Sequence, residues 1–204
     1  MRIEEARRDH YRRLAKKEGY RSRAAYKLIE IDEKFGVLKK GYVVIDFGAA
    51  PGGWLQVASK RVGPSGLVIG VDLKEIKPLS ENVRLLKSDV MDEGISSLLL
   101  SMMPRKADLI LSDLSPKISG IWSVDHLRQI ELCERVLELS QTLLRKNGSM
   151  VMKLFEGELL RDFVGRVRRA FRTVKLFKPK ASRKESSEIY LVSLGFVGGA
   201  YGPD

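Results

Sequence analysis

Short apolar runs alternate with helical patterns along most of the chain. Runs of apolar and β-branched residues predict buried strands at 42–47, 67–71, 83–86, 107–112 and 149–154. Between them, helices are predicted at 53–62, 95–102 and 125–146, the last ended by Asn147-Gly148, while 114–124 has the composition of a loop. Strands that alternate with helices form a parallel sheet covered on both faces, so the pattern predicts an α/β fold.

The beginning of the chain departs from this alternation. Residues 1–20 have poor apolar periodicity, which predicts a basic arm or a loosely docked helix. Ser22 is placed to cap a helix over residues 23–35. The apolar stripe of that helix consists of Ala24, Leu28, Ile31 and Phe35. We therefore expect a basic arm over residues 1–22 and a single domain over residues 23–204.

The end of the chain predicts a different strand pairing. After a helix at 158–171, strands at 173–177 and 188–196 are joined by a polar stretch without a helix. Strands joined in this way pair antiparallel. The whole pattern predicts a doubly wound, mostly parallel sheet of seven strands that ends in an antiparallel hairpin. This arrangement resembles the Rossmann-like class I methyltransferase fold.

Composition narrows the class of protein. The 204 residues, 44% of them hydrophobic, suit one globular domain. No segment resembles a signal peptide or approaches the roughly 20 apolar residues of a membrane span, so we expect a soluble, cytoplasmic protein without a membrane partner. A single cysteine, Cys133, and two histidines argue against a disulfide framework and a zinc site, and no metal is expected. No further apolar stripe is visible, which favours a monomer.

The net charge of +11 is concentrated in two segments. Residues 1–27 hold ten Lys and Arg against four acids, and residues 161–184 hold ten against Asp162 alone. Clustered Lys and Arg commonly contact phosphates, so these segments predict a polyanionic partner, with solvated helix faces as the alternative. The scarcity of Asn and Gln beside 31% charged residues is typical of thermophile proteins.

Acidic residues stand at the carboxyl ends of the predicted strands. Asp72, Asp89 and Asp113 lie at or just after the ends of the second, third and fourth strands, and Asp46 lies near the end of the first. Ligands of doubly wound folds bind at this edge of the sheet. The repeated placement therefore predicts a ligand site there, with a structural turn and four surface acids as the alternative.

The turn that follows Asp46 indicates which ligand to expect. Its glycines are Gly48, Gly52 and Gly53. They let a ligand approach the backbone, but their spacing is not the G-x-G-x-x-G that seats a pyrophosphate. Asp46 would repel a pyrophosphate and suits a ligand with an ammonium and a sulfonium group. Asp72 is placed to accept hydrogen bonds from ribose hydroxyls, and Asp89 from an adenine amino group. These features favour S-adenosylmethionine over NAD as the cofactor.

Five segments carry a recognisable pattern: D-F-G-A-A-P-G-G-W-L-Q from residue 46, D-L at 113, V-M-K-L-F at 151–155, S-R-K-E-S-S-E-I-Y-L-V at 182–192 and R-S-R-A-A-Y-K-L at 21–28. In order and spacing they resemble the FtsJ/RrmJ family of RNA ribose 2′-O-methyltransferases. The resemblance runs from about residue 10 to residue 196, and we expect an archaeal or thermophilic member of the family. The resemblance implies a catalytic tetrad of Lys27, Asp113, Lys153 and Glu188. It also implies cofactor contacts at Gly52, Trp54, Asp72, Asp89 and Asp113.

The residues at these positions suit the chemistry that the resemblance implies. A ribose hydroxyl is a poor nucleophile, so positioning and a base are most of what a protein adds to methyl transfer. Lys153 ends an otherwise apolar strand, where partial burial and a second cation, Lys27, favour a neutral amine. Asp113 and Glu188 oppose that effect and are expected to orient the lysines and hydrogen-bond the ribose. The alternatives are a strand-end Lys153 that reaches solvent and a solvated Lys27.

Several positions stay open at this stage. Glu185 competes with Glu188, which we prefer because the family pattern puts the acid two residues before the tyrosine, here Tyr190. Tyr190 either stacks on a base of the substrate or belongs to the core. Trp54 either packs against the cofactor or begins a helix core, and Trp122 is expected in a mobile substrate flap.

The resemblance implies RNA as the partner. Family substrates include large-subunit ribosomal RNA near the peptidyl-transferase centre and, in other members, the tRNA anticodon loop. A short chain looks more like the ribosomal RNA enzymes, so we expect a uridine of 23S ribosomal RNA, free or within the large subunit. The alternatives are a tRNA or cap-type mRNA 2′-O-methyltransferase, a noncatalytic RNA-binding assembly factor and an NAD-dependent oxidoreductase.

Overall fold

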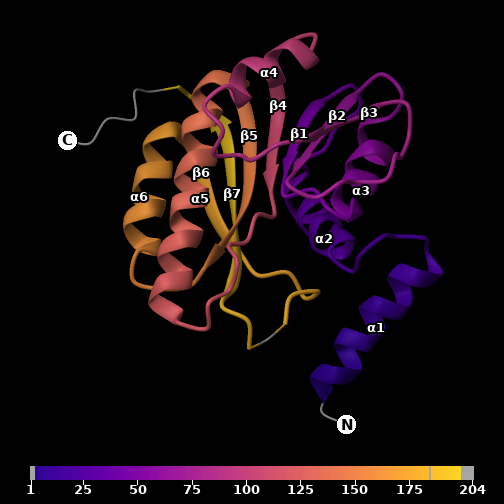
Figure 1. Cartoon of the computed structure of the whole chain (residues 1–204), viewed down its shortest axis with the longest axis vertical. Helices are drawn as coiled ribbons and strands as arrows, with labels where there is room; N and C mark the ends of the chain where they lie inside the picture. The colour runs from indigo at the N-terminus through magenta and orange to yellow at the C-terminus, as the bar shows by residue number, and fades with distance from the viewer. Residues whose placement is uncertain (1–2, 184, 199–204) are drawn as a thin grey trace.

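The computed structural model of the chain describes residues 3–183 and 185–198 (Figure 1). Its helices are α1 (Ile3–Lys17), α2 (Ala25–Phe35), α3 (Gly53–Val62), α4 (Ile95–Met102), α5 (Trp122–Leu143) and α6 (Leu160–Ala170). Its strands are β1 (Val43–Phe47), β2 (Leu67–Asp72), β3 (Val83–Lys87), β4 (Ala107–Ser112), β5 (Leu144–Phe155), β6 (Phe171–Phe177) and β7 (Glu188–Phe196).

All seven strands form one sheet, in the order β3-β2-β1-β4-β5-β7-β6. The first five strands pair parallel, whereas β7 is inserted antiparallel between β5 and β6. The predicted doubly wound sheet with a closing antiparallel hairpin is confirmed. Since the parallel strands share one direction, the ends of β1, β2 and β4 lie at one edge of the sheet, with Asp46, Asp72 and Asp113 at or next to these ends.

Two apolar cores cover the two faces of the sheet, because side chains of each buried strand alternate between them. On one face α4, α5 and α6 pack against residues such as Ile45 and Met152. On the other, α2 and α3 pack against residues such as Val44 and Val151. Asp46 and Lys153 are two residues further along their strands than Val44 and Val151, so they belong to the α2–α3 face.

The boundary between α5 and β5 differs from the prediction. The helix begins at Trp122, inside the predicted loop, and ends at Leu143. Asn147-Gly148 does not end a helix, because β5 already starts at Leu144 and contains both residues. Asn147 has a φ of 64°, and the pairing with β4 shifts register next to this point, so an irregular strand was mistaken for a helix stop. Most other boundaries agree with the prediction within two residues.

The segment before α2 also differs from its prediction. Ser22 makes no capping hydrogen bond through its side chain, and the residue before α2 is Ala24. Residues 3–17 form a helix, and Ala15 is buried against Tyr26 and Ala181. The Tyr26 hydroxyl donates to Glu18 Oε2 at 3.0 Å, so contacts with the domain hold the end of α1. Among the helices that the structure describes, none is long and apolar enough to cross a bilayer.

Candidate active site

Two ion pairs at the carboxyl edge of the sheet are joined through one tyrosine hydroxyl. Lys27 Nζ lies 2.7 Å from Glu188 Oε1, and Lys153 Nζ lies 3.2 Å from Asp113 Oδ1. The Tyr190 hydroxyl donates to Asp113 Oδ1 at 2.8 Å and accepts a hydrogen bond from Lys27 Nζ at 3.2 Å. Together Glu188, Lys27, Tyr190, Asp113 and Lys153 form a continuous series of polar groups, which we call the polar chain.

Strand register brings these groups together. Lys153 on β5 lies opposite Tyr190 on β7, and Glu188 shares the face of Tyr190 because residues two apart on a strand point the same way. Asp113 directly follows β4, and its backbone N–H donates to the Phe47 carbonyl of β1 at 3.0 Å. Lys27 comes from α2, which covers this face. The polar chain therefore joins elements that are far apart in the sequence.

Each charged end of the polar chain has a second anchor. Lys153 Nζ also donates to the Asp113 carbonyl oxygen at 2.8 Å. Ser182 Oγ donates to Glu188 Oε1 at 2.8 Å. The side chains of Lys27 and Lys153 are only 9% and 8% exposed, so the carboxylates offset the cost of burying two ammonium groups.

Tyr190 is buried and does not offer its ring to a substrate. Burial raises the pKa of its hydroxyl well above the usual value, and the carboxylates of Asp113 and Glu188 add to the effect. The hydroxyl therefore stays protonated and remains a donor to Asp113. The ring centroid lies 5.7 Å from that of Trp54, whose indole N–H donates to the Ala24 carbonyl at 2.8 Å. Both aromatic rings belong to the core between α2, α3 and the sheet, which positions Lys27.

Asp46 lies in β1 with its carboxyl group buried. Neither of its oxygens has a hydrogen-bond partner within the described part of the chain. Burial raises the pKa of Asp46 well above its usual value, and the carboxylates of Asp113 and Asp72 add to this. An ionised carboxyl group at this position is costly unless a cation faces it. A ligand with an ammonium or sulfonium group therefore fits this edge, and a pyrophosphate does not.

Asp72 and Asp89 hold the neighbouring backbone turns. Asp72 Oδ2 accepts from the Ala50 N–H at 2.9 Å, and Oδ1 accepts from the Lys74 N–H at 2.8 Å. Asp89 Oδ1 accepts from the Met91 N–H at 2.9 Å. A carboxylate has about four lone-pair positions, so each group keeps capacity to accept hydrogen bonds from a ligand.

The glycines of the turn after β1 allow two other segments of the chain to approach it closely. Gly48 has a φ of 77°, and a Cβ there would lie 2.9 Å from the Leu114 nitrogen, so the turn passes directly over the residue after Asp113. A Cβ at Gly52 would lie 3.0 Å from Arg21 Nη1, and one at Gly53 would meet Ser22 Oγ. Gly52 and Gly53 thus make room for the segment before α2.

Arg21 is a structural part of the site that the sequence did not reveal. Its guanidinium donates to the carbonyls of Lys77 and Pro78, each at 2.7 Å, and its backbone N–H donates to Gln56 Oε1 at 2.7 Å. It therefore fastens the segment before α2 to the loop after β2 and to α3. Its only sequence signal is its place within R-S-R-A-A-Y-K-L, where no periodicity marks it.

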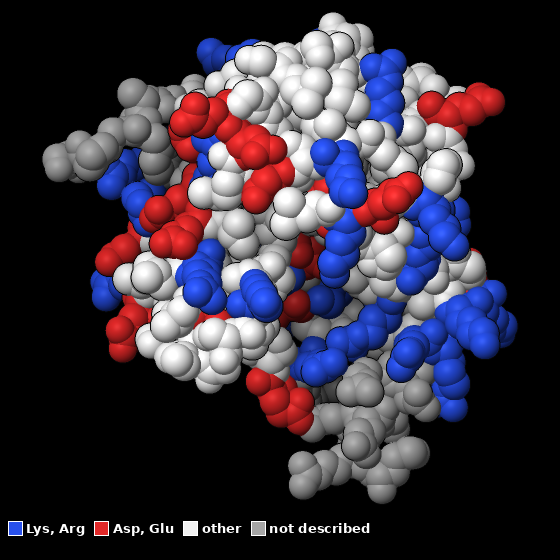
Figure 2. Space-filling model, in the orientation of Figure 1, with Lys and Arg blue, Asp and Glu red and all other residues white. Residues whose placement is uncertain are grey.

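A basic groove leads to the polar chain. A hollow of about 600 Å³ is lined by Arg12, Ala15, Lys16, Tyr20, Arg21, Ser22, Arg23 and Arg183. A second hollow, of about 390 Å³, shares Arg23 and Arg183 with it and reaches Lys27 and Glu188. Figure 2 shows blue side chains gathered over α1, beside a recess in which red and blue atoms lie. We call these two hollows the basic groove.

The two basic segments of the sequence do not form one surface. The start of the chain and Arg183 line the basic groove. The arginines of α6 lie on the other side of the molecule from α1 (Figure 1). Arg166 pairs there with Glu134 of α5. The second segment is therefore divided, and only its last part lies near the polar chain.

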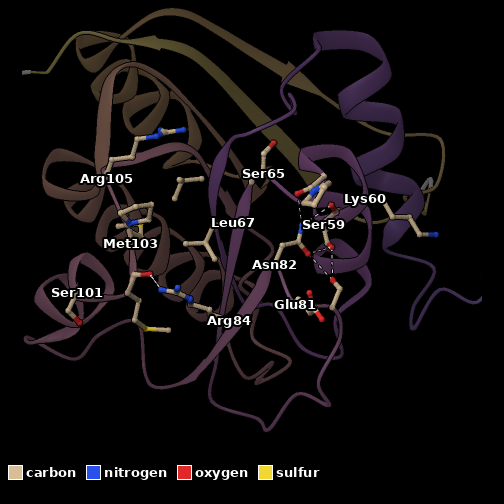
Figure 3. A pocket seen from close by; sticks show the side chains of 17 residues that line it. Ser59, Lys60, Ser65, Leu67, Glu81, Asn82, Arg84, Ser101, Met103 and Arg105 are labelled. Atoms are coloured by element: carbon tan, nitrogen blue, oxygen red, sulfur yellow. Dashed lines mark hydrogen bonds between the residues drawn. The ribbon is translucent and has the colours of Figure 1, made fainter.

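A larger hollow, of about 1070 Å³, lies at the opposite edge of the sheet (Figure 3). It is lined by the amino ends of β1, β2 and β3 and by the ends of α3 and α4. Ser59 Oγ donates to Asn82 Oδ1 at 2.7 Å, and Arg84 donates to the Met102 carbonyl. These polar groups already bond to the protein, and none of the predicted site residues lines the hollow.

The structure brings some of the predicted site residues together and leaves others apart. Lys27, Asp113, Lys153 and Glu188 meet in the polar chain, and Asp46 is close enough to Asp113 and Asp72 to interact electrostatically. Glu185, the rival of Glu188, is exposed and lines the basic groove. Trp122 does not lie in a loop, because it is the first residue of α5.

Comparison with known proteins identifies the family. Residues 20–196 match the family model described as FtsJ-like methyltransferase. The "Ribosomal RNA large subunit methyltransferase E" of Nitrosopumilus maritimus is 43% identical over 97% of this chain and 100% of that protein. The protein of the same name from Methanocaldococcus jannaschii is 44% identical over 94% of this chain and 80% of its own length.

A solved structure agrees with these matches. The crystal structure of a Plasmodium falciparum protein described as a ribosomal RNA methyltransferase is 31% identical, with a TM-score of 0.79, and the match covers 88% of this chain and 100% of that one. The resemblance seen in the sequence is confirmed, and the chain belongs to the FtsJ-like methyltransferase family and is an enzyme.

Proposed function

We propose that the protein transfers the methyl group of S-adenosylmethionine to a ribose 2′-hydroxyl of large-subunit ribosomal RNA, at a uridine. The polar chain carries the proposal, because it places two buried, carboxylate-held lysines at the edge of the sheet where ligands bind. The names of the similar archaeal proteins support ribosomal RNA as the substrate class. The basic groove that leads to Lys27 supports a polyanion.

The carboxyl edge of β1, β2 and β3 suits this cofactor, which supplies an electrophilic methyl group on a positively charged sulfur. Asp46 would face its cationic groups, Asp72 would accept from its ribose hydroxyls and Asp89 from its adenine amino group. Gly52 and Trp54 would contribute through the backbone, since the Trp54 side chain faces the core. The unpartnered carboxyl group of Asp46 is the feature that favours this cofactor over NAD.

Lys153 is the proposed base. Asp113 holds its Nζ through a carboxylate oxygen and the backbone carbonyl, and an ammonium group has three donors, so one position remains for the ribose hydroxyl. Lys153 would accept the hydroxyl proton as the ribose oxygen bonds to the methyl carbon and the bond from that carbon to sulfur breaks, which leaves S-adenosylhomocysteine. Lys27 and Glu188 hydrogen-bond the ribose and fix its orientation. Tyr190 links the two pairs and keeps their spacing.

Methyl transfer from labelled S-adenosylmethionine tests this proposal, with large-subunit ribosomal RNA and tRNA as separate substrates and the methylated nucleotide mapped. Lys153→Ala and Lys153→Arg should each lower the rate at least 100-fold, the lower end of what general acid–base catalysis contributes. Lys146→Ala is the matched control, because Lys146 is an exposed lysine on the same strand. Glu188→Gln and its exposed neighbour Glu185→Gln form a second pair.

Each alternative has its own outcome. Methylation of tRNA alone would replace the substrate, and RNA binding without methyl transfer would indicate an assembly factor. Unchanged transfer by Lys153→Ala would exclude Lys153 as the base. A calorimetric titration that shows binding of NAD but not of S-adenosylhomocysteine would exclude the cofactor.

We also infer that the enzyme acts as a monomer in the cytoplasm. All five groups of the polar chain come from one polypeptide, and ribosomal RNA is the proposed substrate. Light scattering of the purified protein, with and without RNA, tests the first part.

A further inference from the structure

An exposed apolar surface lies beside the polar chain. Ile118, Ile121, Trp122 and Leu127 are 61%, 60%, 50% and 48% exposed, respectively. All four lie within ten consecutive residues around the start of α5, and exposed apolar side chains that gather in one place mark interaction sites. We call these four residues the apolar wall. In Figure 2 a largely white surface lies over the start of α5, across the recess from the blue side chains of α1.

Ring contacts of Trp122 and hydrogen bonds of the turn before α5 orient the centre of the apolar wall. The Trp122 ring stacks on His126, with ring planes 20° apart, and its centroid lies 5.9 Å from that of Phe155. The Asp125 carboxylate accepts hydrogen bonds from the Ser119 N–H at 2.7 Å and from the Gly120 N–H at 3.2 Å, which fixes the turn before α5. The indole is thus half exposed and already oriented.

The position of Phe155 links the apolar wall to the chemistry. Phe155 lies two residues after Lys153 on β5 and opposite Glu188 on β7. Two residues of a strand span roughly 7 Å. The indole of Trp122, in contact with Phe155, therefore lies at the margin of the polar chain, within reach of a nucleotide next to the one that is methylated.

We propose that the apolar wall is a stacking subsite for an unpaired base of the RNA substrate, next to the nucleotide whose ribose reaches Lys153. This inference rests on the proposed function. RNA is recognised in single-stranded segments by aromatic side chains that stack on bases, combined with cations that contact the backbone. Lys117 and Arg128, both exposed, flank the wall and supply such cations. An RNA fits this combination and the adjoining polar chain better than an apolar protein surface does.

Kinetics with substituted enzymes test the subsite. Trp122→Ala should raise the KM for RNA about ten-fold or more, with a smaller change in kcat, because stacking of one base on an aromatic side chain contributes binding on this scale. Trp122→Phe should recover most of the loss. Leu98→Ala is the control, because Leu98 on α4 is 45% exposed and lies outside the site. The affinity for S-adenosylhomocysteine should be unchanged in all three.

Fluorescence gives a readout that does not depend on turnover. A short single-stranded RNA should quench the emission of the wild type, in which Trp122 is half exposed and Trp54 is buried, and Trp122→Phe should abolish the quenching. Unchanged KM in Trp122→Ala together with undiminished quenching in Trp122→Phe would overturn the subsite. So would a loss of activity confined to intact ribosomal subunits, which would indicate a protein partner. Absence of any RNA methylation by the wild type would overturn the proposed function instead.

Discussion

At the scale of single residues, two buried polar groups show how the site is prepared. Asp46 carries a carboxyl group whose burial opposes ionisation, with two further carboxylates near it. Tyr190 keeps its proton for the same reason, but its hydroxyl is fully engaged between Lys27 and Asp113. The Asp46 carboxyl group thus lacks a hydrogen-bond partner within the described chain, whereas the Tyr190 hydroxyl links two ion pairs.

Asp46→Asn should stabilise the free protein at neutral pH. The pKa of Asp46 is raised in the folded state, so its contribution to stability is present below the ordinary carboxyl pKa, about 3.9, and is lost as pH rises toward the raised value. The wild type should therefore lose stability relative to the variant from about pH 4 upward, by roughly 1 kcal/mol or more at pH 7. Urea unfolding between pH 5 and 8 measures this difference.

The same substitution should weaken cofactor binding. Asp46, whose pKa is raised in the free protein, ionises when a cation faces it, so the affinity of the wild type for S-adenosylmethionine should rise with pH. Asp46→Asn should bind roughly ten-fold or more weakly, an electrostatic loss of about 1.4 kcal/mol, with a flat pH dependence. Asp162→Asn, at an exposed position on α6, is the control for both measurements. Parallel pH profiles of wild type and Asp46→Asn would contradict this account.

Tyr190→Phe should lower the free energy of unfolding clearly, with only a modest fall in kcat. The change leaves Lys27 and Asp113 each without one hydrogen bond, and hydrogen bonds to charged groups contribute about 1.5–3 kcal/mol. The unfolding free energy should fall by about that amount in urea titrations, while kcat falls far less than in Lys153→Ala. Tyr42→Phe, at a half-buried tyrosine outside the polar chain, is the control. Equal stability losses in the two variants would argue against the bridging role of Tyr190.

At the scale of elements, the turn after β1 and the pairing of β5 with β7 build the site. The turn crosses over the residue after Asp113 because Gly48 has no side chain. The antiparallel pairing puts Lys153 opposite Tyr190. A shift of the β7 register by one residue would turn the Tyr190 side chain to the other face of the sheet. Each element thus positions one half of the site.

Gly48→Ala and Gly36→Ala separate backbone strain from close approach. Both glycines have positive φ, 77° and 62°, but a Cβ at Gly36 meets nothing within 4 Å, whereas one at Gly48 meets the Leu114 backbone. Gly36→Ala should cost about 1 kcal/mol of stability and leave cofactor affinity unchanged. Gly48→Ala should cost clearly more and weaken cofactor binding at least ten-fold. Urea unfolding and calorimetric titration measure both effects, and equal results for the two variants would contradict the close-approach argument.

At the scale of the whole molecule, the two basic segments form separate surfaces, and the sequence did not show which of them lies near the polar chain. The basic groove lies between α1 and the segment that contains Arg183, next to the polar chain. The α6 arginines lie on the opposite side of the molecule from α1 (Figure 1). Only the first surface is positioned to guide RNA to Lys153.

Paired substitutions should distinguish these surfaces. Arg12→Gln with Lys16→Gln should weaken RNA binding and reduce the slope of log affinity against log salt by about 1–2, since each phosphate contact contributes roughly 0.7–0.9. Arg161→Gln with Arg168→Gln, which changes exposed residues of α6, should leave the slope unchanged. Cofactor affinity should barely depend on salt in any of these proteins. A larger effect from the α6 pair would place the RNA on the other surface.

Much of this architecture could be predicted from local patterns. Burial imposes a period of two on strands and 3.6 on helices, so β1, β4, α3 and α4 were predicted with boundaries at or within one residue of those observed. The α5–β5 boundary was wrong because Asn147 and Gly148 are also suited to an irregular strand, and only pairing with β4 decides between the two. Ser22 was expected to cap α2, but its side chain instead lies against Gly53.

The sequence by itself determined the α/β class, the edge where acids gather and the candidates Lys27, Asp113, Lys153 and Glu188, because these follow from periodicity, strand ends and family resemblance. Only the tertiary structure decided that Tyr190 joins the ion pairs, that Arg21 fastens the segment before α2 and that Trp122 stands exposed beside Phe155. The physical reason is that these roles depend on contacts between residues far apart in the chain, such as Lys27 and Tyr190, 163 positions apart. No local pattern encodes such contacts, because packing of α2 and α5 against the sheet creates them.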